Sequence, residues 1–274
     1  MSCNSALAFD IKKQCREIIL SITAERKNWL LCNGEVSTRF QGKLPRCGLS
    51  AISMAAELIQ NQKADTGTAF CAGQEQHNKE LGNLLSMARS KGYSQQGEMY
   101  SAENLGQLAK EFYGLGCQVI SYGFEDHQFI VSELLKGSAV LVPYDADKNH
   151  KPCLENGHKA HWALLTGVLC QLDDNIIDWT MFKQDEEVPV LFHTSPSSTF
   201  ILPHNCKPQN TYFCAKHGKS SHTAVWGLDC LKRSNANLFE LDPSKEKQVG
   251  NFIVPEEGIR VGLCEKILVI SDQR

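Results

Sequence analysis

Apolar residues in the first half of the chain recur at helical spacing. From residue 47 to residue 60, apolar side chains fall at steps of three and four, which predicts a helix with one buried face. Ser101 suits a helix N-cap, and Gly114 suits the end of that helix. The same reasoning predicts helices over residues 5–26, 47–60, 77–93, 101–114 and 128–137.

The pattern changes after residue 137, where short apolar runs are bounded by turn residues. Such runs are typical of buried strands. Between them, residues 181–210 are rich in proline, serine and acidic residues, which predicts a long loop within an insertion of about 171–210. Helices followed by strands indicate an α+β fold. We expect one unit over 1–274, with a mainly helical lobe over 1–136 and a mainly β lobe over 137–274. The predicted strands lie within 138–147, 160–172, 211–226 and 265–270.

Composition and charge narrow the class of protein. The chain has 274 residues, of which 42% are hydrophobic and 22% charged, a profile typical of globular proteins with a sizeable core. A formal net charge of −3 favours neither nucleic acid nor a membrane surface as a partner. We see no apolar run of about 18–20 residues and no secretion signal. These features predict a cytoplasmic protein with no nucleic-acid or membrane partner.

The chain contains 12 cysteines, a number that invites a disulfide interpretation. However, the chain is long and rich in other core residues, so it does not need a scaffold of bridges. It contains no C-x-x-C pair, which argues against a four-cysteine zinc ribbon. We therefore expect most of these thiols to be small reduced core residues.

The stretch "QGKLPRCGLSAI", residues 41–52, places a cysteine at the start of a predicted helix. Unpaired N–H groups at a helix N-terminus lower the pKa of a thiol, so Cys47 is a candidate nucleophile. Gln41 can donate its amide to the oxyanion of acyl transfer, together with the Cys47 N–H. Gly48 is expected to leave room for a substrate backbone. The alternative is a buried core cysteine on an ordinary helix.

A cysteine nucleophile needs a histidine base. Of nine histidines, His161 is the best placed, because it opens the apolar run "HWALLTGV" and a strand would hold it rigidly. An isolated histidine in such a place is commonly structural. A rival interpretation is a zinc site, because nitrogen and sulfur ligands recur in this segment, as His150, Cys153, His158 and His161.

The motif Q-x5-C-G-x5-M, which begins at Gln41 and ends at Met54, resembles the nucleophile segment of papain-like cysteine peptidases, and is closest to their C39-like branch. With the stretches "GYSQQGEMYSAENLGQLAKEF", "GHKAHWALLTGV" and "AKHGKSSHTAVWGLDCLKRSNANL", the chain resembles the actin maturation protease (actin aminopeptidase) family. This resemblance runs from about residue 40 to the C-terminus and is weak over 171–210.

The resemblance implies a papain-like fold, with the nucleophile helix in an N-terminal helical lobe and an antiparallel sheet in the C-terminal lobe. It also implies removal of an N-acetylated methionine or cysteine from immature actin, which exposes an acidic N-terminus. Cys47 would then be the nucleophile, His161 the base and Gln41 the oxyanion donor, with no cofactor. A third residue would orient His161, and either Asp178 or His217 is a candidate.

An acidic substrate also needs cationic contacts. The nearest candidates are Lys43, Arg46 and Lys159, with Lys216 and Lys219 further along the chain. Mammalian relatives carry a proline-rich extension suited to profilin, whereas the nine prolines here are scattered, which puts profilin in doubt as a partner. Two other interpretations remain open, namely another papain-like thiol hydrolase such as a deubiquitinase, and a catalytically silent module that binds actin or another peptide.

Overall fold

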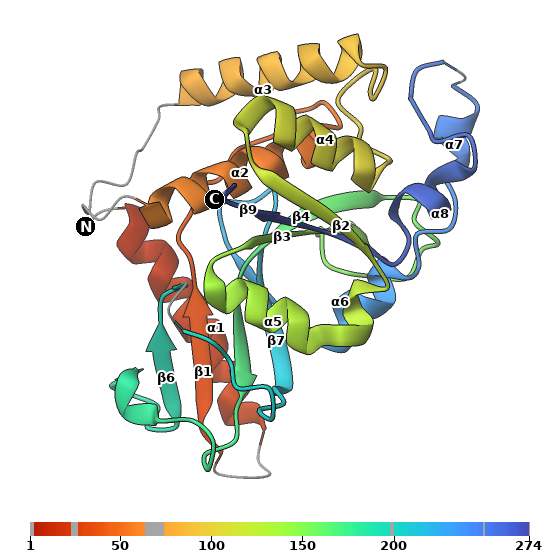
Figure 1. Cartoon of the computed structure of the whole chain (residues 1–274). Helices are drawn as coiled ribbons and strands as arrows, with labels where there is room; N and C mark the ends of the chain where they lie inside the picture. The colour runs from red at the N-terminus through yellow and green to blue at the C-terminus, as the bar shows by residue number, and fades with distance from the viewer. Residues whose placement is uncertain (1–2, 23–26, 64–73, 198–199, 249, 274) are drawn as a thin grey trace.

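The computed structural model describes residues 3–22, 27–63, 74–197, 200–248 and 250–273, and combines helices with one mixed β-sheet (Figure 1). The helices are α1 (Cys3–Ser21), α2 (Cys47–Lys63), α3 (Gln74–Ser90), α4 (Ala102–Tyr113), α5 (His127–Lys136), α6 (Leu228–Asn235), α7 (Pro243–Glu246) and α8 (Gly258–Leu263), with 3₁₀ turns η1 (Gly123–Asp126) and η2 (Trp179–Met181). The strands are β1 (Trp29–Asn33), β2 (Gly116–Ser121), β3 (Ala139–Asp145), β4 (Ala160–Gln171), β5 (Lys183–Gln184), β6 (Leu191–Thr194), β7 (Gln209–Lys216), β8 (Ala224–Gly227) and β9 (Lys266–Ser271).

Strand β4 is the centre of the sheet. It has 12 residues and pairs antiparallel with β3, β1 and β7. Strand β3 pairs with residues 160–165 of β4, and β1 pairs with residues 167–171. Strand β7 pairs with residues 164–171, which overlap both ranges, so β7 lies along one edge of β4 and β3 and β1 lie end to end along the other. The main order is β2-β9-β3-β4-β1-β6-β5, and β8 joins through β7. Strands β1 and β6 are parallel, and the other described pairs are antiparallel.

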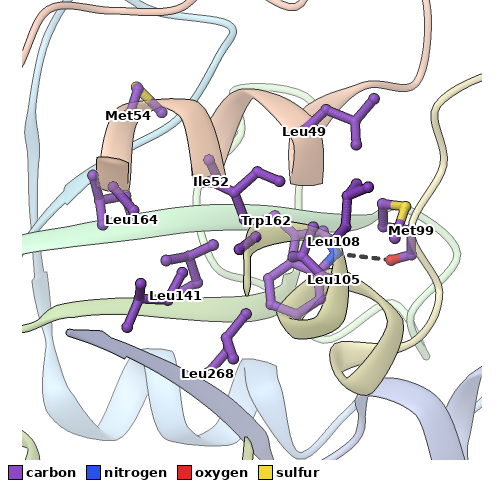
Figure 2. Close-up of a cluster of buried hydrophobic side chains, with 14 of the residues drawn as sticks. Leu49, Ile52, Met54, Met99, Leu105, Leu108, Leu141, Trp162, Leu164 and Leu268 are labelled. Carbon is purple, nitrogen blue, oxygen red and sulfur yellow. Dashed lines mark hydrogen bonds between the residues drawn. The ribbon is translucent and has the colours of Figure 1, made fainter. Parts of the chain in front are cut away.

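Helices cover both faces of this sheet (Figure 1). Because successive side chains of a strand point to opposite faces, β3 contributes to two separate cores. Leu141 packs with α2, α3 and α4 on one face, whereas Val140 and Val142 pack with α5 on the other. Figure 2 shows the first core, in which side chains of α2 lie directly over Trp162 and Leu164 of β4. This packing fixes α2 against the strand that begins beside His161.

The α+β organisation predicted from the sequence is confirmed, and the helices predicted at 47–60, 77–93, 101–114 and 128–137 correspond to α2, α3, α4 and α5. Helix α4 has both predicted ends, since the Ser101 side chain accepts a hydrogen bond from the Asn104 N–H and Gly114 adopts the left-handed conformation. The helix predicted at 5–26 corresponds to α1, and its last predicted residues, 23–26, lie outside the described residues. The predicted strands are present as β3, β4, the pair β7 and β8, and β9.

Several short elements were not predicted. Strand β1 has five residues, too few to show a period, and β2 is a half-buried strand at the end of the sheet. The stretch 181–210 was predicted to be a loop, and this is wrong in part, because it contains β5 and β6. Strand β6 obtains its backbone partners from β1, more than 150 residues away in sequence, which no local pattern reveals.

The sheet draws strands from both halves of the chain. Strands β1 and β2 precede residue 136 and pair with β4 and β9, which follow it. The division into two lobes at residue 136 stays a prediction. None of the helices in the described ranges combines the length and apolarity that crossing a bilayer requires.

Candidate functional site

Helix α2 begins at Cys47, as the sequence predicted. The Arg46 carbonyl accepts the first helical hydrogen bond, from the Ser50 N–H, at 2.9 Å. The N–H groups of the first turn are therefore not used within the helix, and those of Cys47 and Gly48 interact with the Cys47 sulfur. This arrangement presents a thiol and backbone donors together at one helix end.

Gly48 lies in a closely packed place. A Cβ at this position would lie 3.0 Å from the Met99 Cβ and 3.2 Å from the Trp162 Cδ1. The Trp162 indole donates to the Met99 carbonyl at 2.8 Å, which ties the segment before α4 to β4 (Figure 2). Glycine thus lets α2 approach Trp162, whose backbone N–H also reaches the Cys47 sulfur. That Gly48 also leaves room for a substrate backbone stays a prediction.

His161 is the second residue of β4, where the apolar run predicted it. It is 8% exposed, and its ring contacts three other rings. The centroid distances are 5.1 Å to His150, 5.6 Å to His217 and 5.8 Å to Tyr144. Its Nε2 is buried and has no hydrogen-bond partner among the described residues. A buried polar atom left in this state is unusual in a folded protein.

Cys47 and His161 line one pocket of about 190 Å³, as does Gln41. Its apolar wall includes Met99 and Trp162. The structure therefore brings together three residues that are far apart in sequence and that were selected as candidate catalytic residues.

Gln41 is held in a loop that precedes α2. Its backbone N–H donates to the Gly218 carbonyl at 3.0 Å, and its side-chain Nε2 donates to the Leu44 carbonyl at 3.2 Å. The Oε1 atom is buried and has no hydrogen-bond partner within the described ranges. An amide nitrogen carries two hydrogens, so one remains for a ligand in the pocket.

Burial has the largest effect on the pKa values of the Cys47 thiol and the His161 imidazole. It raises the pKa of the Cys47 thiol, although the backbone N–H groups of Trp162 and Gly48 and the Lys245 ammonium act in the opposite direction. The sequence-based expectation of a lowered thiol pKa is therefore wrong, because burial has the larger effect. Burial lowers the pKa of His161 well below its ordinary value, and the charges of His217 and other neighbouring cations act in the same direction. Burial therefore favours the uncharged form of both groups.

The two candidates for the third residue lie in different places. His161 and Gln171 are ten residues apart on β4, a separation of about 33 Å in a strand. Asp178 lies beyond the end of this strand, after a turn in which the N–H groups of Ile176 and Ile177 donate to the Asp173 carbonyl, and it does not line the pocket of His161. It instead accepts hydrogen bonds from Thr180. His217 follows β7, is 5% exposed and contacts the His161 ring edge to face. Burial lowers the pKa of His217 to about 4.

The expected cationic contacts are only partly in the pocket. Lys159 lines it and is also 3.7 Å from Glu155. Arg46 donates to the Gln41 carbonyl through two nitrogens, at 3.2 and 3.3 Å, and Lys43 is exposed outside the lining.

Among the other lysines suggested by the sequence, Lys219 lines the pocket and donates to the Gly42 carbonyl at 2.8 Å. Lys216 is buried and donates to the Ser221 carbonyl at 3.2 Å. The sequence analysis missed Lys245 and Tyr100, which also line the pocket. No local motif marks Lys245, because it reaches the pocket from a four-residue helix near the C-terminus.

The residues suggested as zinc ligands do not form one cluster. His150 contacts His161, whereas His158 lies at the surface with its Nε2 3.1 Å from the Glu240 Oε1. In the part of the chain that the structure describes, no group of three or more histidine, cysteine, aspartate or glutamate side chains could hold a metal ion.

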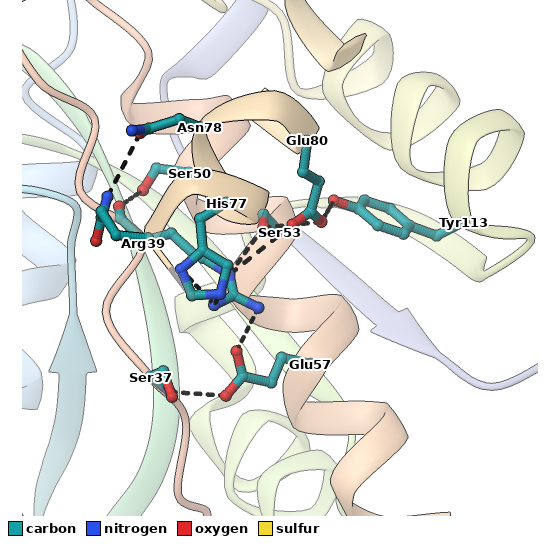
Figure 3. Close-up of polar contacts among 10 residues, drawn as sticks. Ser37, Arg39, Ser50, Ser53, Glu57, His77, Asn78, Glu80 and Tyr113 are labelled. Atoms are coloured by element: carbon teal, nitrogen blue, oxygen red, sulfur yellow. Dashed lines mark hydrogen bonds and ion pairs between the residues drawn. The ribbon is translucent and has the colours of Figure 1, made fainter. Parts of the chain in front are cut away.

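A buried charge network fixes the loop that carries Gln41 (Figure 3). Arg39 is 5% exposed, and its Nη2 lies 2.7 Å from the Glu57 Oε2 of α2. Its Nε lies 3.2 Å from the Ser53 Oγ and 4.0 Å from the Glu80 Oε2 of α3. The guanidinium also contacts the His77 ring. One side chain therefore connects the loop to two helices, two residues before Gln41.

We expect replacement of Arg39 by leucine to lower the free energy of unfolding by about 3–5 kcal/mol, because the buried Glu57 carboxylate would lose its charged partner. Urea unfolding would measure this change. Lys79→Leu is the matched control, since Lys79 is an exposed cation on α3 and should change stability by no more than about 0.5 kcal/mol. A cost below about 1 kcal/mol for Arg39→Leu would show that the network does not stabilise the loop.

Sequence comparison relates the chain to a family of known proteins. Residues 36–169 match the family model described as "Actin maturation protease-like, C-terminal domain". This range includes Gln41, Cys47 and His161. The chain is 35% identical over 264 residues to the actin maturation protease of Xenopus tropicalis, an alignment that covers 96% of this chain and 80% of that relative.

Two further relatives bear the same name. The human protein is 33% identical over 250 residues, which cover 89% of this chain and 66% of the relative. The Drosophila melanogaster protein is 32% identical over 230 residues, which cover 83% of this chain and 66% of the relative. The similarity therefore covers most of the chain.

Proposed function

Because the chain belongs to the actin maturation protease family, we propose that it is a cysteine aminopeptidase that removes the N-acetylated first residue from immature actin. The residue removed is an acetylated methionine or cysteine. In this proposal Cys47 is the nucleophile, His161 the general base and acid, and Gln41 the side-chain oxyanion donor.

One observation carries the proposal. The Gln41 Oε1 and the His161 Nε2 are buried without hydrogen-bond partners among the described residues, and both side chains line the pocket that contains Cys47. Leaving such atoms unpaired costs stability, about 1–3 kcal/mol each, and the cost is understandable where an N–H group of a bound peptide donates to the Gln41 Oε1 and the reaction brings a proton to the imidazole. A cysteine that was merely part of the core would not explain two unpaired polar groups beside it.

The first half of the reaction forms a thioester. The proton of the Cys47 thiol passes to His161 as the sulfur attacks the carbonyl carbon of the acetylated residue. The carbonyl oxygen becomes negative and accepts hydrogen bonds from the Cys47 backbone N–H and the Gln41 Nε2. His161 then gives its proton to the leaving nitrogen, and the C–N bond breaks. The new N-terminus of actin departs as an amine.

The second half releases the acetylated residue. Water loses a proton to His161 and attacks the thioester carbonyl, and the same donors bind the oxyanion. The C–S bond breaks, and the Cys47 sulfur recovers its proton from His161. A neutral thiol and a neutral imidazole fit this cycle, because the proton moves from one to the other only when the carbonyl is attacked.

The papain-like fold is part of the proposal. Its support is a helix that begins at Cys47 and packs against the strand that carries His161. His217 takes the place of the orienting residue, because its ring contacts His161 and its Nδ1 accepts from the Lys219 N–H at 3.3 Å. That hydrogen bond leaves Nε2 as the protonated nitrogen of His217.

The test is mass spectrometry of acetyl-Met-Asp and acetyl-Cys-Asp peptides after incubation with the protein. The proposal predicts loss of one acetylated residue as a single unit, and no loss with Cys47→Ala. Intact peptides under conditions in which the protein is folded would contradict the aminopeptidase assignment. Cleavage by both proteins would contradict the role of Cys47.

Replacement of Gln41 by alanine should lower kcat by about 10²- to 10³-fold with little change in KM, because the amide acts on the oxyanion and not on the ground-state substrate. Steady-state kinetics on the acetyl-Met-Asp peptide would measure this effect. Gln41→Glu is the matched variant, since it keeps the size of the side chain but puts an acceptor near the oxyanion, and we expect an equal or greater loss. A raised KM with unchanged kcat would assign Gln41 to substrate binding instead.

A further inference from the structure

Lys245 reaches the candidate active site from α7. Its Nζ donates to the Tyr100 hydroxyl oxygen at 3.2 Å and lies 5.8 Å from the centre of that ring. It also lies 5.9 Å from the centre of the Phe252 ring. Lys245 lines the pocket with Cys47 and His161, and its charge lowers the pKa of both groups. The ammonium is therefore held close to the reacting atoms.

No carboxylate forms an ion pair with Lys245 anywhere in the described ranges, since none lies within 4.0 Å of its Nζ. The two acids that line the pocket face backbone donors. Glu98 accepts from the N–H groups of three residues at 2.7–2.9 Å, and Asp147 accepts from two. Asp242, at the start of the same helix, is close enough for Lys245 to lower the pKa of its carboxyl group, but it accepts its hydrogen bond from the Ser244 N–H. A half-buried ammonium without an ion-paired carboxylate is well placed to receive an anion.

The Tyr100 hydroxyl provides a second hydrogen-bond donor beside the Lys245 ammonium. Its oxygen accepts from Lys245, so its own hydrogen stays available for a ligand. Burial raises the pKa of the Tyr100 phenol, which keeps that hydrogen in place at neutral pH. An ammonium beside a phenol offers two donors to the two oxygens of one carboxylate.

Lys245 also lines a second hollow, of about 430 Å³. Its lining includes the apolar residues Leu241 and Phe252, but also Glu240 and Glu246. These two carboxylates would repel an acidic residue placed further along this hollow. The charge pattern thus favours a ligand carboxylate at Lys245, where the second hollow meets the pocket of Cys47.

We propose that Lys245, together with the Tyr100 hydroxyl, binds the side-chain carboxylate of an acidic residue adjacent to the bond that is cleaved. Lys245 would then be the residue that selects acidic N-termini. This inference rests on the proposed function, and it assigns the selection to a lysine outside the group Lys43, Arg46 and Lys159.

The experiment compares three acetylated peptides, which begin acetyl-Met-Asp, acetyl-Met-Asn, and acetyl-Met-Asn with an aspartate two residues later. Turnover is measured with the wild type, and affinity with the Cys47→Ala variant. We expect the first peptide to be preferred about tenfold or more in both measurements. Lys245→Gln should reduce that preference to less than about twofold, whereas Lys245→Arg should restore most of it. The control Lys247→Gln, an exposed lysine at the end of the same helix, should leave the preference unchanged.

A charge reversal sharpens the test. Lys245→Glu should prefer acetyl-Met-Lys over acetyl-Met-Asp, since the charge at residue 245 is reversed. Equal weakening of the aspartate and asparagine peptides by Lys245→Gln would overturn the inference, because Lys245 would then bind something common to both. Equal cleavage of both peptides by the wild type would also overturn it while leaving the peptidase assignment intact. Carboxylate-dependent binding to Cys47→Ala without any cleavage by the wild type would support the inference and contradict the proposed function.

Discussion

Replacement of Cys47 by alanine is expected to lower kcat/KM on an acetyl-Met-Asp peptide by about 10⁴- to 10⁶-fold and to leave peptide affinity nearly unchanged. The sulfur forms the covalent intermediate, and the backbone donors at the start of α2 cannot replace it. They still bind the carbonyl oxygen, so some catalysis over water remains. Kinetics at substrate concentrations well below KM, together with a binding measurement on the variant, would give both numbers.

The control for this prediction is Cys230→Ala, because Cys230 is an exposed free cysteine that is not part of the pocket lining. It should keep wild-type turnover. A silent binding module predicts a different pattern, in which the wild type has no turnover to lose and neither replacement changes affinity. Retention of more than about a hundredth of the wild-type kcat/KM by Cys47→Ala would remove Cys47 from the chemistry.

Replacement of His161 by alanine should lower kcat/KM by at least about a thousandfold, because no other group in the proposal takes the thiol proton. The pH dependence gives the sharper result. The pKa of His161 is lowered well below its ordinary value, mainly by burial, so the neutral base persists as the pH falls through about 6.5. Wild-type activity should therefore remain near its maximum at pH 6 and decline only at lower pH. The variant should lack this acidic limb, and its residual activity should rise with pH as thiolate forms.

His158→Ala is the matched control, since His158 is a surface histidine on the loop before β4 and pairs with Glu240. It should keep both the rate and the acidic limb of the wild type. If His161→Ala retained an acidic limb at the same pH as the wild type, another group would be the base. An acidic limb centred near or above pH 6.5 in the wild type would show that burial does not govern this imidazole.

The elements that carry the site were predictable because local chemistry determines them. Apolar side chains at steps of three and four indicate the helix from Cys47, and the apolar run after His161 is long enough to indicate a buried strand. Their association was predicted only through the need of a cysteine for a base and through family resemblance. The structure supplies the physical cause, which is the packing of α2 on Trp162 and its neighbours.

Other features depend on distant parts of the chain and leave little local signal. Lys245 enters the pocket from the C-terminal region, and β6 pairs with β1, which lies more than 150 residues earlier in the sequence. The protonation of Cys47 was predicted wrongly, because a sequence shows the helix end but not the depth of burial, and burial has the larger effect. Asp178 looked suitable by sequence distance alone, yet the 12-residue length of β4 carries it away from His161.

The most direct test of the account is to identify which sulfur becomes acylated. An aryl ester of acetylmethionine acylates a thiol faster than the thioester is hydrolysed, so the intermediate should accumulate and survive an acid quench. Peptide mapping by mass spectrometry should then find one acetylmethionyl group, on Cys47 and on none of the other 11 of the 12 cysteines. Hydrolysis of the ester with the adduct on a different cysteine, or with no adduct on Cys47 at any time, would contradict the account.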